Sequence, residues 1–384
     1  MKILEIQGQV EGGGSERHTF ILARALRNRG HDVVLCVPDE PHAMIDEVVA
    51  DGFEVERFPL VPSWRRIADV SGGMRIKKII ERHGIDIVHS HLFNADAIGL
   101  MGARLTGRPV VTTLHGATLN PDLERTLVVR SFLWGVSRIF RQMDHRIAIS
   151  PFVRRFVSKD VSLDPDTIEV IYNSTETTLH EGEFDRERIR KEIGVPTGCR
   201  VILCLGVLNA QKRTRLFIDM ALRLASDRSD CHFVLAGLGG MMEELKHRVV
   251  EAGLSERFHF LGYRSDVPGL LSVTDILAFP AQDEGFGRSM TEAMSSSVPV
   301  VAFDSGACPD VVEDGVTGYV VADGDVAAMA ARCKELLDDP ALKERLGRAG
   351  LERARELFDV PRFADRTEAV LLRVLRRHRA LAGH

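Results

Sequence analysis

The segment 283–293 of the sequence, DEGFGRSMTEA, has the residue types to hold a polar ligand. It contains two carboxylates, Glu284 and Glu292, with seven residues between them, a glycine-rich turn, and a helix expected to begin near Arg288. The unpaired N–H groups at a helix start can hold a diphosphate. Carboxylates suit a phosphate poorly but are good partners for vicinal sugar hydroxyls. The segment therefore predicts a site for a ligand carrying both groups; the alternative is that Glu292 is an exposed helix acid.

Candidate residues also lie in the loops that follow three of the expected strands. The turn 11–16 contains Gly13 and Gly14, which let a ligand approach the backbone, although a tight strand-to-helix turn would need the same residues. His115 follows the strand expected at 109–113 and can hydrogen-bond a ligand or, as a lone histidine more often does, a backbone carbonyl. Lys212 comes six residues after Gly206, where its ammonium group can meet a phosphate or stay solvated.

Neither glycine run fits the dinucleotide-binding pattern GxGxxG. With Gly12 and Gly14 as the first two glycines, the third position is Arg17, and in the run that begins at Gly237 it is Met242. A nicotinamide-dependent dehydrogenase is therefore only a minor alternative.

The elements that position these residues alternate between short apolar runs and amphipathic helices. Because a helix joins successive strands, the strands must be parallel, and the pattern predicts two Rossmann-like doubly wound domains facing across a cleft. The expected domains are residues 1–178, residues 179–359, and a C-terminal helix at 360–384 that packs back on the N-terminal domain. The expected strands are 3–6, 33–37, 85–88, 109–113, 146–149 and 168–171, then 201–205, 232–236, 258–261, 276–279 and 298–302.

Composition excludes several classes of protein. The chain has 384 residues, 27% of them charged, and a formal net charge of −5, which argues against a disordered chain and a dedicated nucleic-acid binder. It contains no long apolar run, and its six cysteines form no CxxC pair, so a secreted, membrane-spanning, disulfide-bonded or zinc-finger protein is not expected. The expected location is a reducing cytosol.

The charge is distributed unevenly along the chain. Residues 57–159 contain 17 Lys and Arg against 7 Asp and Glu, a balance of +10. Arg125, Arg130, Arg138 and Arg141 flank Phe132-Leu133-Trp134, which is expected to be exposed. This stretch predicts a surface for an acidic acceptor or for peripheral contact with an anionic membrane at its inner face; the alternative is a solubilising surface.

Taken together, the motifs resemble the retaining glycosyltransferases of family 4, which have the GT-B fold. The resemblance covers nearly the whole chain and is carried by the Glu-x7-Glu spacing in EGFGRSMTEAM and by GGSERHTFILARAL, RGHDV, HSH, TLHG, HRIAISPFVRR, VIYNSTE, LGVLNAQK, VLAGLGG, FLGYRSDVPGLL and VPVVAFDSGACPDVVEDGVTGYVV.

The resemblance implies a role for each matching residue. Three catalytic positions are implied: His115 beside the transferring sugar, Lys212 on the diphosphate and Glu284 on the sugar hydroxyls. The implied donor-binding residues are Gly13 and Gly14 against the diphosphate, the amides of Phe286, Gly287, Arg288 and Ser289, Glu292 on the ribose, and Arg264 near the nucleobase. No metal and no cofactor are implied, because cationic and helix-terminal groups stabilise the leaving diphosphate.

The reaction that the resemblance implies is transfer of a hexose from UDP or GDP, with retention, to a hydroxyl of a glycan, a lipid-linked sugar or a small molecule. Two departures stand out: Val207 replaces a usual Arg, for which Arg213 or Arg288 could substitute, and Asn173-Ser174 replaces a usual Asn-Gly. The alternatives are a catalytically weak GT-B protein that binds a nucleotide sugar and a sugar-nucleotide epimerase.

Overall fold

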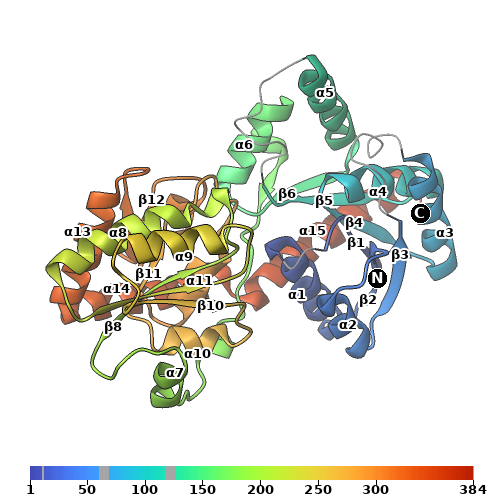
Figure 1. Ribbon diagram of the computed structural model, residues 1–384. Coiled ribbons are helices and arrows are strands. Elements are labelled where there is room, and N and C mark those ends of the chain that lie inside the picture. The colour runs from blue at the N-terminus through green and yellow to red at the C-terminus, as the bar shows by residue number, and fades with distance from the viewer. Residues whose placement is uncertain (11–12, 60–68, 117–126, 384) are drawn as a thin grey trace. The chain divides into compact units, whose positions relative to one another are not determined.

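The computed structural model describes residues 1–10, 13–59, 69–116 and 127–383 (Figure 1). The chain divides into two compact units, Met1–Asn173 together with Val360–His384, and Ser174–Asp359. The first boundary thus follows Asn173, whereas the sequence placed it after 178, and the last helix belongs to the first unit. Gly12 and Arg125, which the sequence singled out, lie outside the described residues.

The first unit is built on a seven-stranded parallel sheet in the order β3-β2-β1-β4-β5-β6-β7. Its strands are β1 (Lys2–Gln7), β2 (Asp32–Pro38), β3 (Glu54–Phe58), β4 (Ile87–His91), β5 (Val110–Leu114), β6 (His145–Ala148) and β7 (Glu169–Val170). Its helices are α1 (Gly14–Asn28), α2 (Ala43–Ala50), α3 (Val70–His83), α4 (Phe93–Thr106), α5 (Leu127–Gln142), α6 (Pro151–Val161) and α15 (Val360–Leu381).

Helix α15 closes one face of this sheet. A stripe of its residues at helical spacing, from Phe363 to Val374, joins the same apolar core as α1, α2 and one face of the strands. Arg29, the C-cap residue of α1, pairs with Asp365 at 2.7 Å, and Arg379 pairs with Asp86 at 2.9 Å. The C-terminal helix therefore docks on the N-terminal sheet, as the sequence predicts.

The second unit contains a six-stranded parallel sheet in the order β10-β9-β8-β11-β12-β13. Its strands are β8 (Arg200–Leu205), β9 (Cys231–Ala236), β10 (Phe258–Gly262), β11 (Ile276–Phe279), β12 (Val300–Phe303) and β13 (Gly318–Val321). Its helices are α7 (Arg186–Glu192), α8 (Thr214–Asp227), α9 (Met242–Glu251), α10 (Val267–Ser272), α11 (Arg288–Ser295), α12 (Cys308–Val311), α13 (Val326–Asp338) and α14 (Pro340–Arg353).

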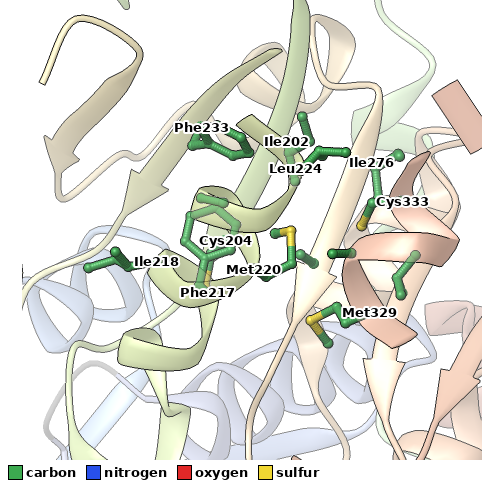
Figure 2. Close-up of a cluster of buried hydrophobic side chains, with 14 of the residues drawn as sticks. Ile202, Cys204, Phe217, Ile218, Met220, Leu224, Phe233, Ile276, Met329 and Cys333 are labelled. Carbon is green, nitrogen blue, oxygen red and sulfur yellow. The ribbon is translucent and has the colours of Figure 1, made fainter. Parts of the chain in front are cut away.

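One face of the second sheet carries a continuous apolar core (Figure 2). Alternate residues of the strands, such as Ile202 and Phe233, meet Phe217 and Leu224 of α8 and Met329 of α13. Because strand side chains alternate between faces, the residues between these point to the opposite face. The sheet is therefore buried on both sides, which explains the nearly continuous apolar runs in its sequence.

Several local expectations are corrected by the structure. Strand β3 was not expected from the sequence. It lies at the edge of the sheet and only Phe58 of its five residues is buried, so its sequence has no continuous apolar run. Of the three residues Phe132-Leu133-Trp134 in α5, only Trp134 is exposed, at 65%, whereas Leu133 is buried and Phe132 packs its ring 5.3 Å from that of Phe93. In α15 the buried stripe passes through Leu371 and Leu375 and leaves Leu372 half-buried. None of the described helices combines the length and the apolar character that a membrane crossing needs.

The docking of α15 predicts a contrast between two leucines on the same helix. Leu371 is fully buried, whereas Leu381 is 79% exposed. We expect Leu371→Ala to lower the free energy of unfolding by about 2–5 kcal/mol, because it leaves a cavity in the core. Leu381→Ala should change it by less than about 0.5 kcal/mol. Urea unfolding of both variants tests this, and equal effects would contradict the docking.

Candidate active site

The predicted site residues of the second unit gather where its strand order reverses. Strands β8 and β11 are neighbours in the sheet although β9 and β10 come between them in the sequence. Their connections therefore leave in opposite directions and open a crevice at their carboxyl ends. Gly206 and Lys212 follow β8, and the segment 283–289 follows β11. Lys212, Gly206 and Phe279 line a small cavity there.

Two glycines bring the backbones of this crevice into close contact. A Cβ on Gly237, after β9, would collide with the carbonyl oxygen of Gly206. A Cβ on Gly306 would collide with the backbone of Glu284, and Gly306 also has a φ of +63°. The close backbone contact at Gly237 therefore accounts for a glycine there without a dinucleotide-binding motif.

Lys212 and Glu284 form an ion pair that joins the two loops. Both side chains are about four-fifths buried, with 20% and 18% of their surface exposed. The Lys212 ammonium also lies 5.3 Å from the centre of the Phe279 ring. The structure thus places two of the three predicted catalytic residues in direct contact at the switch point.

Helix α11 begins beside this pair. Its N-cap residue, Gly287, has a φ of +79° and no side chain to cap the helix. Phe286 is buried and packs edge-on against Phe358 at a centroid distance of 5.4 Å, which anchors the turn. The start of the helix and half-buried Ser289 therefore lie at the same edge of the sheet as Lys212 and Glu284.

Arg288 and Glu292 lie one turn apart on α11. Nη2 of Arg288 is 3.3 Å from Oε1 of Glu292, and both side chains are largely buried. Nη1 of Arg288 is buried and has no hydrogen-bond partner among the described residues. A buried donor on a charged group is costly unless a ligand satisfies it. This positive charge, together with the helix start, makes the edge suitable for an anion.

Arg213 and Arg264, the other arginines that the sequence singled out, bind side chains of the protein itself. Arg213 hydrogen-bonds Gln282 at 2.9 Å and pairs with Asp323 at 2.5 Å. Arg264 is paired with Asp266 at 2.6 Å and also with Glu192, so its guanidinium holds the start of α10 and the end of α7. That Arg264 lies near a nucleobase remains a prediction.

The predicted site residues of the first unit lie at the carboxyl ends of β1 and β5. Gly13 is the N-cap of α1 and Gly14 its first residue, after β1, while half-buried His115 follows β5. Among the described residues, the hydrogen-bond partner of His115 is another imidazole and not a backbone carbonyl: its Nε2 lies 3.0 Å from Nδ1 of His91. The sequence assigned no role to that second histidine.

His115 is the accessible end of a buried polar cluster. His91 contacts Oε2 of Glu5 through its Nε2 at 2.8 Å, and His89 contacts the same carboxylate and Thr113 Oγ1. His89 and His91 lie two residues apart on β4, so they point to the same face and reach Glu5 on β1. The sequence signal was the alternation in HSH, but nothing in it located Glu5.

His18 of α1 completes this cluster. Its Nδ1 donates to Oδ1 of Asn173 at 2.9 Å, and its Nε2 is buried without a partner among the described residues. Burial lowers the pKa of His18, His91 and His115 well below the ordinary value, so these imidazoles are neutral near pH 7.

Asp96 of α4 is a second buried carboxyl near these strands. Its Oδ1 accepts hydrogen bonds from Ser90 and Thr112, both at 2.6 Å. Burial raises its pKa to about 7, and the two hydroxyl groups only partly offset this effect. The folded protein therefore holds a proton that an unfolded carboxyl, with a pKa of about 3.9, releases.

This difference predicts a pH-dependent effect of Asp96→Asn. Because the folded pKa is raised, the stability that Asp96 contributes is present below pH 4 and is lost as the pH rises toward 7. Asparagine mimics the neutral form, so the variant should gain stability relative to the wild type between pH 5 and pH 8. Urea unfolding at both values measures this gain, with Asp32→Asn, whose side chain is 70% exposed, as the control. A constant difference would contradict the raised pKa.

Comparisons with known proteins agree with the fold and show the family. The family model described as glycosyl transferases group 1 matches residues 185–353, and that for glycosyltransferase family 4 matches residues 12–179. The chain is 31% identical to the lipopolysaccharide core biosynthesis mannosyltransferase LpsB of Rhizobium meliloti, over 62% of this chain and 68% of LpsB. It is 24% identical to the N-acetyl-alpha-D-glucosaminyl L-malate synthase of Bacillus anthracis, over 95% of each chain.

A solved structure supports the fold alone. HepE from Anabaena, in complex with UDP, matches with a TM-score of 0.85 at 23% identity, over 97% of this chain and 99% of HepE. The chain belongs to the GT-B glycosyltransferases of the family 4 type, enzymes of glycoconjugate biosynthesis. The resemblance and the fold class predicted from the sequence are thereby confirmed.

Proposed function

We propose that this glycosyltransferase moves a hexose from a UDP- or GDP-linked donor to an acceptor hydroxyl, with retention of the anomeric configuration. The observation that carries the proposal is the edge of the second sheet. It holds the Lys212–Glu284 pair, the start of α11, and Nη1 of Arg288, which has no hydrogen-bond partner among the residues that the structure describes. It offers positive charge for a diphosphate and a carboxylate for sugar hydroxyls within one crevice. That LpsB is named a mannosyltransferase and HepE was solved with UDP is consistent with such a donor.

In this proposal each side chain has a distinct task. Lys212 neutralises the diphosphate, and Glu284 accepts hydrogen bonds from the hydroxyls of the donor sugar. Glu292 accepts hydrogen bonds from the ribose, while the amides at the start of α11 meet the sugar and the phosphate. Gly13 and Gly14 let the diphosphate approach the backbone of the first unit, where His115 lies beside the transferring sugar.

The proposed reaction needs no metal ion. Negative charge develops on the diphosphate as the bond to the sugar breaks, and fixed cations and a helix N-terminus stabilise such charge. Lys212 and Arg288 supply the cations. We further propose that retention proceeds on one face of the sugar, with the leaving phosphate taking the proton of the acceptor hydroxyl. Glu284 is paired with Lys212, which suits it to hold hydroxyls rather than to attack the anomeric carbon.

The acceptor is proposed more broadly. The two relatives are named for different acceptor chemistry, lipopolysaccharide core in one and malate in the other. Helices α5 and α6 border a groove of ≈ 670 Å³ lined by Arg130, Trp134, Arg138 and Arg141. Arg138 lies 5.2 Å from the ring centre of exposed Trp134. An aromatic ring among cations favours an anionic acceptor or an anionic membrane surface for this groove.

A panel of nucleotide sugars and acceptors tests the proposal, with the products identified by mass spectrometry and NMR. Transfer with an α-linked product from an α-linked donor would support it. Nucleotide binding without transfer would favour the nucleotide-sugar-binding alternative, and conversion of the donor sugar without an acceptor would favour the epimerase. Including lipid-linked acceptors in anionic and neutral vesicles tests the role of the groove.

The two glutamates should have different effects on the kinetics. Glu292→Gln removes a charge-assisted hydrogen bond to the ribose, which is worth about 1.5–3 kcal/mol, so KM for the donor should rise by roughly 10- to 100-fold. Glu284→Gln should lower kcat by at least about tenfold with little change in nucleotide affinity, because its contacts strengthen as the sugar reacts. Steady-state kinetics measure both, and Glu251→Gln at the exposed end of α9 is the control. Wild-type kinetics in both folded variants would overturn the assignment.

Arg288 and Arg213 provide a test of which arginine offsets Val207. Arg213 has two protein partners, whereas Nη1 of Arg288 has none among the described residues, so Arg288 should supply the missing positive charge. We expect Arg288→Met to weaken binding of the nucleoside diphosphate about tenfold or more, and the monophosphate less. Arg213→Met should weaken either by under about threefold. Isothermal titration of both variants with UDP, UMP, GDP and GMP measures these affinities. A larger loss of diphosphate affinity in Arg213→Met than in Arg288→Met would contradict the assignment of Arg288.

A further inference from the structure

Three imidazoles of the first unit come together from three different elements. His18 lies on α1, His91 ends β4 and His115 follows β5. Each ring places one nitrogen within 4.8 Å of one nitrogen of each of the other two rings. The closest pair, Nδ1 of His91 and Nε2 of His115, is 3.0 Å apart. Two nitrogens on one tetrahedral zinc ion, at about 2.05 Å each, would be about 3.3 Å apart.

The other nitrogens of two of these rings are already fixed. Nδ1 of His18 donates to Oδ1 of Asn173 at 2.9 Å, and Nε2 of His91 donates to Oε2 of Glu5 at 2.8 Å. Metal-binding histidines usually donate their second ring N–H to a carboxylate or carbonyl in this way. The remaining nitrogen of each ring then carries a lone pair on the side of the cluster. Nε2 of His18 is buried there without a partner among the described residues.

We propose that His18, His91 and His115 form a binding site for a divalent transition-metal ion of the zinc type. Three neutral imidazoles are suitable ligands for such an ion. Half-buried His115 marks the accessible side, where a fourth position stays open to solvent or ligand, as in exchangeable rather than structural zinc sites. When the ion binds, the proton between His91 and His115 moves to Nδ1 of His115, so no net proton is released.

Two other groups of polar side chains fit a metal less well. Glu5, His89 and His91 are also close together, but His89 is hydrogen-bonded at both nitrogens, to Glu5 and to Thr113. That group therefore supports the orientation of His91. In the second unit His232 and His259 lie 2.9 Å apart, and they supply only two imidazoles.

The site has a consequence that rests on the proposed function. If His115 lies beside the transferring sugar, an ion bound to its imidazole occupies that group and its surroundings. Zinc should then act as a reversible inhibitor of a reaction that itself needs no metal, and a chelator should restore the activity.

The test titrates Zn²⁺, and Co²⁺ as a spectroscopic probe, into untagged protein freed of metal by a chelator. We expect one equivalent to bind and cobalt to give the visible absorption of a four-coordinate site with nitrogen ligands. His18→Ala and His115→Ala should each weaken binding at least about tenfold, since each removes one of three ligands. His232→Ala is the matched control and should bind as the wild type does. Circular dichroism checks that each variant is folded.

The outcomes separate this inference from the proposed function. Unchanged binding in His18→Ala and His115→Ala, or loss of binding in His232→Ala, would overturn the site. One equivalent bound through these histidines together with reversible zinc inhibition would support both the site and the place of His115. One equivalent bound without inhibition would support the site and overturn only the placement of His115 beside the sugar.

Discussion

The parallel pairing of strands is the constraint on which both units depend. It sends the carboxyl end of every strand to one edge of its sheet, and the reversal of strand order opens that edge between β1 and β4 and between β8 and β11. Lys212 and the loop that carries Glu284 meet because their strands are neighbours in the sheet, although 72 positions separate them. Glu5 and His89 meet for the same reason, since they are register partners on β1 and β4.

Both edges carry polar groups that a core would not tolerate. In the second unit the carboxylate of Glu284 is neutralised by Lys212, but Nη1 of Arg288 has no partner in the described part of the chain. In the first unit, Glu5 lies fully buried beside imidazoles, and no described residue offers a partner to Nε2 of His18. Unsatisfied buried groups cost stability and persist where a ligand can satisfy them. In each unit these groups lie near the edge of the sheet where we propose that the donor is bound.

Helix α15 shows how the first sheet is completed by a distant part of the chain. The crossovers α1 and α2 cover part of one face, and α15 adds Phe363, Val370 and Leu371 to the same core. The second unit needs no such addition, because α8, α9 and α13, all from its own segment, cover the corresponding face. The returning helix thus makes the first unit depend on residues at both ends of the sequence.

The sequence by itself determined what is local or periodic. Alternating apolar runs and amphipathic helices specify a parallel α/β fold, and the segment 283–293 carries its glutamates, turn and helix start within eleven residues. Edge strand β3 was not predicted, because an edge strand buries few of its side chains. Only the tertiary structure decided which distant residues meet. The cluster of Glu5, His18, His91 and His115 comes from four elements, and the choice between Arg213 and Arg288 depends on which partners each reaches. The direction of a side chain depends on how the elements pack against one another, and the spacing of residues along the chain does not specify that packing.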